Sequence, residues 1–109
     1  MGLSKYPKKI RKQLRELAAT AHANKMKNNL HRLSLKFDEW KQGQISNSDL
    51  NQSIHEYHDG AARELWKSYH YSDEDFFVAR AVVHGFLTRD EMPDEVYEAL
   101  KEIIENLKE

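Results

Sequence analysis

The chain has 109 residues and a mass of 12.9 kDa, which fits one small domain. Cysteine is absent, so disulfides, thiolate metal sites and cysteine nucleophiles are excluded. Four Gly and two Pro are too few for a turn-rich β fold, and two Trp, five Tyr and four Phe supply a modest core. No apolar run is long enough for a membrane span or a secretory signal, so we expect a cytoplasmic protein without a membrane partner.

Charge is distributed unevenly along the chain. Residues 1–36 contain ten Lys and Arg and one acidic residue, which gives +9. Residues 37–109 contain seven basic and 17 acidic residues, which gives −10. The net charge of −1 therefore conceals a basic arm, residues 1–36, joined to an acidic body, residues 37–109, within one helical domain.

The first predicted helix runs from Lys8 to Lys41 and begins after Pro7. Its apolar residues form two stripes at three- and four-residue spacing: Ile10, Leu14, Leu17, Ala18 and Ala21, then Met26, Leu30, Leu33, Phe37 and Trp40. Because the stripes are out of phase, we expect a bend, a break or a change of packing partner near residues 22–29. A straight helix of this length would measure about 51 Å, so two segments are favoured over one rod.

The second predicted helix follows a stop at Gly43, is capped by Ser46 or Ser48, and runs to about Tyr69. On a wheel of 100° per residue its apolar residues, with His58 among them, fill roughly half of the circumference. We therefore expect a central helix packed between two neighbours.

Two further helices are predicted. Ser72 and the three acidic residues after it open one of them, and its apolar segment, residues 76–87, should be the most buried element. The β-branched content of that segment would also suit a strand, but its acidic start favours a helix. Pro93 opens the last helix, whose apolar stripe is Val96, Leu100, Ile103, Ile104 and Leu107. The predicted fold class is all-α, a small bundle of four to five helices.

Six polar residues are candidates for a small site: His55, His58, Asp59, Arg63, Arg80 and His84. His55 and His58 with adjacent Asp59 have a spacing at which imidazole and carboxylate groups can share a metal. The sequence fixes no third ligand, so we expect His58 to be a core histidine and no metal or other cofactor to bind. Arg80 lies in the most apolar segment, so we expect it to be partly buried and bonded to a carboxylate or a backbone carbonyl.

Arg63 and His70, separated by six residues, resemble the arginine–histidine motif of the HEPN ribonucleases. The resemblance implies that both side chains act on an RNA backbone across a dimer. A chain of this composition gives about one such match by chance, and Arg15 with His22 is a second. A small helical hydrolase or ribonuclease is therefore the alternative, and a non-enzymatic role is favoured.

The clearest candidate binding surface is a cluster of five cations on two turns of the first helix, Lys8, Lys9, Arg11, Lys12 and Arg15. Such a cluster binds phosphates by counterion release, or it binds an acidic protein surface. Tyr6 is the only aromatic residue of the arm, so stacking of bases is poorly supported. We favour a protein partner or a homo-oligomer over nucleic acid, because the acidic body would repel phosphates.

Four segments, FDEW (residues 37–40), GQIS (43–46), IHEYHDGAAREL (54–65) and VARA (78–81), carry a resemblance over about half of the chain. The sequence resembles small all-helical bacterial proteins of uncharacterised function. The resemblance implies a bacterial cytoplasmic protein and identifies no catalytic residue. We predict a non-enzymatic helical interaction or regulatory domain that binds a protein, or itself, through its basic N-terminal helix.

Overall fold

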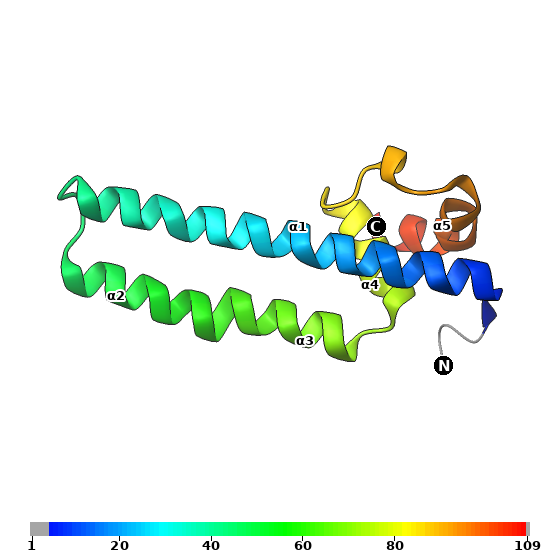
Figure 1. Ribbon diagram of the computed structural model, residues 1–109, viewed down its shortest axis with the longest axis horizontal. Helices are drawn as coiled ribbons and strands as arrows, with labels where there is room; N and C mark the ends of the chain where they lie inside the picture. The colour runs from blue at the N-terminus through cyan, green and yellow to red at the C-terminus, as the bar shows by residue number, and fades with distance from the viewer. Residues whose placement is uncertain (1–4, 109) are drawn as a thin grey trace.

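The computed structural model describes residues 5–108, and every regular element in that range is helical (Figure 1). The elements are α1 (Lys8–Lys41), α2 (Asn47–Glu56), the π-helical turn η2 (Tyr57–Ala62), α3 (Arg63–Tyr71), α4 (Glu74–Val83), the 3-10 turn η3 (Arg89–Glu91) and α5 (Asp94–Lys108). The predicted all-α class and helix number are confirmed, while residues 1–4 of the predicted basic arm lie outside the described range. Within it, no helix is both long enough and hydrophobic enough to cross a bilayer.

The molecule is elongated, 53 × 26 × 26 Å, and α1 runs along most of its length (Figure 1). α2, η2 and α3 form one continuous helical rod that lies antiparallel to the C-terminal half of α1. We call this two-helix part, residues 25–71, the stalk. α4 and α5 pack on the N-terminal half of α1 and form the head, residues 5–24 and 72–108.

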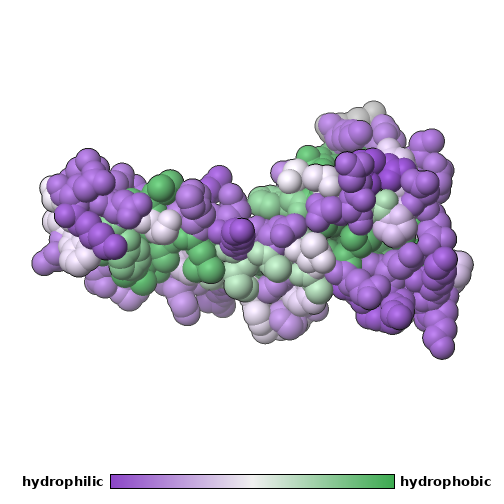
Figure 2. All heavy atoms as spheres, turned by 45° about the horizontal axis from the view of Figure 1, so that its top comes forward, coloured by the Kyte–Doolittle hydropathy of each residue, from purple (hydrophilic) through white to green (hydrophobic). Residues whose placement is uncertain are grey.

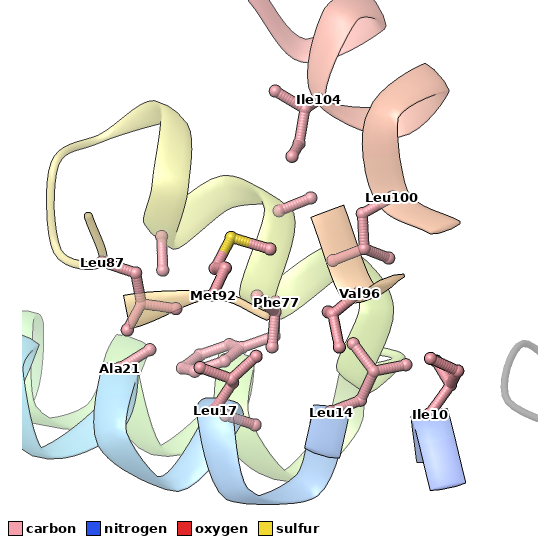
Figure 3. Close-up of a cluster of buried hydrophobic side chains, with 14 of the residues drawn as sticks. Ile10, Leu14, Leu17, Ala21, Phe77, Leu87, Met92, Val96, Leu100 and Ile104 are labelled. Carbon is pink, nitrogen blue, oxygen red and sulfur yellow. The ribbon is translucent and has the colours of Figure 1, made fainter. Parts of the chain in front are cut away.

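The hydrophobic core lies in the head. Side chains of α1 and α5 interdigitate there with those of α4 and with the loop that follows it (Figure 3). Leu14, Val96 and Leu100 are fully buried. The apolar residues of α1 and of α5 recur every three to four residues, so each helix turns one apolar stripe towards this core. Leu50 is the one buried apolar residue of the described range that lies outside this cluster. The core of the domain is therefore the head, and the stalk contributes little to it.

α1 is one uninterrupted helix of 34 residues, so the preference for two segments was wrong. Its two apolar stripes are out of phase because the helix changes its packing partner, which was one of the three predicted explanations. At 100° per residue the stripe of Leu14 and Leu17 points about 150° away from that of Leu33 and Phe37. The first stripe faces α4 and α5 and the second faces α2 and η2, so one straight helix serves both neighbours.

The tip of the stalk confirms the predicted helix signals. Gly43 adopts a positive φ of 76°, which a residue without Cβ tolerates, and α1 ends there. Ser46 and Asp49 form a capping box, because Ser46 Oγ accepts from the Asp49 amide at 3.0 Å and Asp49 Oδ2 accepts from the Ser46 amide at 3.1 Å. The Trp40 indole donates to Asn47 Oδ1 at 2.8 Å and fastens α1 to α2.

The π-helical turn η2 corrects the expectation of a central helix. A π-turn inserts about one extra residue and rotates everything after it back around the helix. Leu65 and Tyr69 thereby return to the side that carries Leu50 and Tyr57, and the broad predicted arc becomes one narrow seam against α1. His58 is left at the edge of that seam with its side chain 84% exposed, so its assignment to the core was wrong.

α4 confirms the predicted helix in the apolar segment, although it ends at Val83, before Gly85 at a φ of 83°. Phe77, Val78 and Ala79 are buried, whereas Phe76 is 44% exposed. α5 begins directly after Pro93, as predicted. Its stripe is buried at Val96, Leu100 and Ile104 and half-buried at Ile103 and Leu107.

Candidate functional site

The six candidate polar residues do not form one site. His55, His58, Asp59 and Arg63 are exposed on the stalk, whereas Arg80 and His84 belong to the head. The His58 Nδ1 atom lies 3.3 Å from Asp59 Oδ1, a contact between two exposed side chains. Within residues 5–108, no three His, Asp or Glu side chains come close enough to hold a metal ion.

Arg80 is partly buried, as predicted, but its partner is neither a carboxylate nor a carbonyl. Its Nη2 atom donates to Ser72 Oγ at 3.0 Å, across the junction of α3 and α4. The buried carboxylate of the head is Asp75, which accepts a hydrogen bond from the Tyr6 hydroxyl at 2.9 Å. The two residues are 69 positions apart, so no local pattern could reveal the pair.

The two residues of the ribonuclease-like motif lie at opposite ends of α3 and line different hollows. Arg63 borders one with His58 and Trp66, and His70 borders another with Arg15. The His70 ring packs against Trp66 in a tilted arrangement, with centroids 4.5 Å apart. The geometry thus gives the motif no shared pocket.

The basic arm lies beside acidic residues of the head. Lys9 Nζ is 3.2 Å from Glu95 Oε1, and Gln13 donates to the same oxygen at 2.9 Å. The hydrogen bond from Gln13, with that from Lys9, lowers the pKa of Glu95. Burial raises the pKa of Glu74, while the nearby Arg15 charge opposes that rise. The segregation of charge along the chain is thus partly neutralised by the fold.

Lys8, Lys12 and Arg15 are exposed on α1, and Arg11 is half-buried. Lys8 and Lys12 precede Met26 and Leu30 by 18 residues each, which is about five helical turns. Lys8 and Lys12 therefore share one side of α1 with Met26 and Leu30.

Large apolar side chains are exposed along one side of the stalk, where Figure 2 shows hydrophobic atoms between the polar ones. The exposed fractions are 40% for Met26, 47% for Leu30, 37% for Ile54 and 50% for Trp66. Met26 and Leu30 lie one turn apart on α1. Ile54 and Trp66 lie on the adjoining flank of the α2–η2–α3 rod. We call this surface, Met26, Leu30, Ile54, Ala62 and Trp66, the stalk face.

Each flank of the stalk has a hollow. The flank opposite the stalk face has a groove of about 430 Å³ whose lining includes apolar Leu33, Tyr57 and Ala61 as well as charged Arg32, Lys36 and Glu56. The stalk face has its own hollow of about 410 Å³, lined by His58, Asp59, Ala62, Arg63 and Trp66. Three of the predicted site residues therefore border the stalk face. Its apolar centre was missed because the sequence pattern predicted two neighbours covering that helix.

Comparison of the chain with known protein families, curated proteins and solved structures finds no match.

Proposed function

We propose that this chain is a non-enzymatic helical interaction module that binds a protein through the stalk face. The observation that carries the proposal is the exposure of four large apolar side chains, Met26, Leu30, Ile54 and Trp66, on one side of a two-helix stalk. Scattered apolar residues are ordinary on a protein surface, but a contiguous row of them is typical of a contact surface. Trp is also enriched among the residues that dominate binding energy.

The proposal moves the main contact surface from the basic arm to the stalk. The apolar side of the arm is not accessible to a partner, because Ile10, Leu14 and Leu17 are buried in the head. Its charged side keeps Lys8, Lys12 and Arg15 exposed, at a spacing that holds them on one helix side. That row is the second candidate surface, for nucleic-acid phosphates or an acidic protein, and we retain bacterial cytoplasm as the proposed setting.

The test is site-specific photocrosslinking of the full chain in cells that express it. A photoreactive residue at position 30 should give protein adducts, whereas the same residue at position 35 should not. Leu30 and Leu35 are matched, with 47% and 49% exposure on the same helix, and they point about 140° apart. Adducts in equal amount at both positions, or at neither, would exclude the stalk face as the contact surface.

A further inference from the structure

We infer that the hollow where α1, α3 and α4 meet is a binding site for a small phosphate monoester. The hollow has a volume of about 380 Å³ and is lined by Arg15, Tyr69, His70, Ser72 and Glu74. It lies at the junction of head and stalk, where Figure 1 shows the short link from α3 to α4 turning towards α1. Pockets for small organic molecules measure about 300–1,000 Å³, so a phosphate group and a small organic body fit there. The site includes no residue of the stalk face.

The lining residues carry hydrogen-bond donors that the fold does not use. Arg15, Tyr69 and His70 each have at least one donor. Within residues 5–108, none of these three side chains makes a hydrogen bond to another residue. Ser72 Oγ accepts from Arg80 Nη2 at 3.0 Å, so its own hydroxyl hydrogen remains available. The lining therefore supplies four donors, from α1, from α3 and from the link before α4.

Positive charge at this junction is incompletely neutralised. In the described part of the chain, no carboxylate oxygen lies within 4.0 Å of a side-chain nitrogen of Arg15, Arg80 or Lys25. Burial, and after it the charge of Arg80, lowers the pKa of Lys25. Burial, and after it the charge of His70, lowers the pKa of His22. Cationic groups that oppose one another in this way favour the binding of an anion between them.

The charge and shape of a phosphate monoester match this lining. Such a group carries a charge of about −1.5 to −2 at pH 7 and has three acceptor oxygens. Three oxygens can accept from donors on three chain segments, whereas the two oxygens of a carboxylate lie in one plane. Glu74 is the only acidic residue of the lining, and it faces two arginines, Arg15 in the lining and Arg80 on Ser72. The local charge is therefore positive, and Glu74 weakens the attraction without reversing it.

Neighbouring aromatic rings hold two of the lining groups in place. The Tyr69 ring contacts His22 of α1 and Phe77 of α4, with centroids 4.4 and 5.5 Å apart. The His70 ring contacts Trp66, with centroids 4.5 Å apart. Side chains that are ordered before a ligand arrives lose less conformational freedom when it binds, so these contacts favour affinity.

NMR titration of the full chain with phenyl phosphate, in a buffer without phosphate or sulfate, tests the site. We expect a dissociation constant below about 1 mM. The ring-proton resonances of His70 should shift, whereas those of His55, which is exposed on the stalk, should stay fixed. A constant above about 1 mM, or shifts of equal size at both histidines, overturns the site.

Inorganic phosphate is the second probe, and it distinguishes the free ion from a monoester. It should bind at least about threefold more weakly than phenyl phosphate, because it has no organic body to contact the hollow. Equal or tighter binding of inorganic phosphate overturns the monoester as the ligand.

Three single substitutions locate the bound phosphate. Arg15→Gln should raise the dissociation constant of phenyl phosphate about tenfold or more, because a charged hydrogen bond is lost. Arg32→Gln, the matched control, removes the same charge from an exposed arginine of the same helix and should change the constant by less than about twofold. Glu74→Gln should lower the constant about threefold, since it removes a carboxylate that repels the ligand.

The variants also separate a defined site from diffuse attraction to the basic arm. Equal losses in Arg15→Gln and Arg32→Gln, or weaker binding by Glu74→Gln, would overturn the site. Circular dichroism confirms that each variant is folded. If Arg15→Gln loses helix content, His70→Gln takes its place and should weaken binding at least about threefold.

Discussion

The Tyr6 hydroxyl donates a 2.9 Å hydrogen bond to Oδ2 of Asp75, which ties the segment before α1 to the first turn of α4. Asp75 is 1% exposed, and its other oxygen accepts from the Phe76 amide at 2.8 Å. A buried carboxylate is tolerated only when donors surround it, so Tyr6 supplies one of the two contacts that make this position possible.

Tyr6→Phe should therefore destabilise the fold by about 1–3 kcal/mol, because Asp75 stays buried and loses a donor. Tyr71→Phe is the matched control. Tyr71 is 76% exposed, and its hydroxyl should contribute less than about 0.5 kcal/mol. Urea unfolding at pH 7 measures both. Equal losses in the two variants would show that the bond to Asp75 is unimportant.

The same pair predicts a dependence on alkaline pH. Burial, followed by the hydrogen bond and charge of Asp75, raises the pKa of Tyr6 above its ordinary value of 10.0. A group whose pKa is higher in the folded protein than in the unfolded chain stabilises the fold fully at pH values below its unfolded-state pKa. That stabilisation is lost as the pH rises towards its folded-state pKa. The free-energy difference between wild type and Tyr6→Phe should therefore narrow from pH 8 to pH 11. A constant or widening difference would contradict this assignment.

Substitution by alanine should lower the free energy of unfolding far more at one leucine of α1 than at another. Leu14 is fully buried in the head and Leu35 is 49% exposed on the back of the stalk. Leu14→Ala should cost about 2–5 kcal/mol, because it removes buried methyl groups and leaves a cavity. Leu35→Ala should cost less than about 0.5 kcal/mol. Denaturant melts at a single protein concentration compare them, and similar losses would place part of the core in the stalk.

The π-turn η2 should be removable with little loss of stability. Deleting Gly60 converts the α2–η2–α3 rod into a regular α-helix while keeping Leu50 and Leu65 on the seam, so the unfolding free energy should stay within about 1 kcal/mol of wild type. Gly60 has no positive φ, and a Cβ there would meet nothing within 4 Å. Deleting Gln52, an exposed residue of regular α2, should instead rotate Leu50 off the seam and cost about 2 kcal/mol. Equal costs for the two deletions would mean that η2 does not set the register.

The exposed cations of α1 should bind nucleic acid only weakly. Glu74 and Glu95 lie beside the arm, so we expect no micromolar affinity for a mixed-sequence duplex at about 150 mM salt. Binding at low salt should disappear in Lys8→Glu/Lys12→Glu. These exposed positions replace a truncation of the arm, which would remove core residues Ile10 and Leu14. Micromolar binding at that salt concentration would favour the nucleic-acid alternative.

The elements with strong local signals could be predicted from the sequence. The ends of α1, the stop at Gly43 and the start of α5 after Pro93 depend on glycine, capping and proline chemistry within a few residues, and the structure has them where expected. The continuity of α1 could not be predicted, because a phase change looks the same whether the helix breaks or changes neighbours.

The stalk face and the contacts of the polar residues could not be predicted from the sequence, for different reasons. A regular 100° wheel cannot anticipate the extra residue of η2, so it placed His58 in the core and spread Leu65 away from the seam. The partner of Arg80 depends on where the α3–α4 junction places Ser72. The stalk face is itself a consequence of tertiary arrangement, since the same apolar pattern fits a helix with one neighbour or two.

The sharing of α1 between the two ends of the molecule also dictates the order in which the protein can be completed during synthesis. The helical hairpin needs nothing beyond Tyr71, so its two helices can pair while the rest of the chain is still being made. The stripe of Ile10, Leu14 and Leu17 must wait for α4 and α5, which follow the hairpin in the chain. The stripe therefore stays uncovered while the hairpin is being made, and α5 is the last of its covering helices to be synthesised.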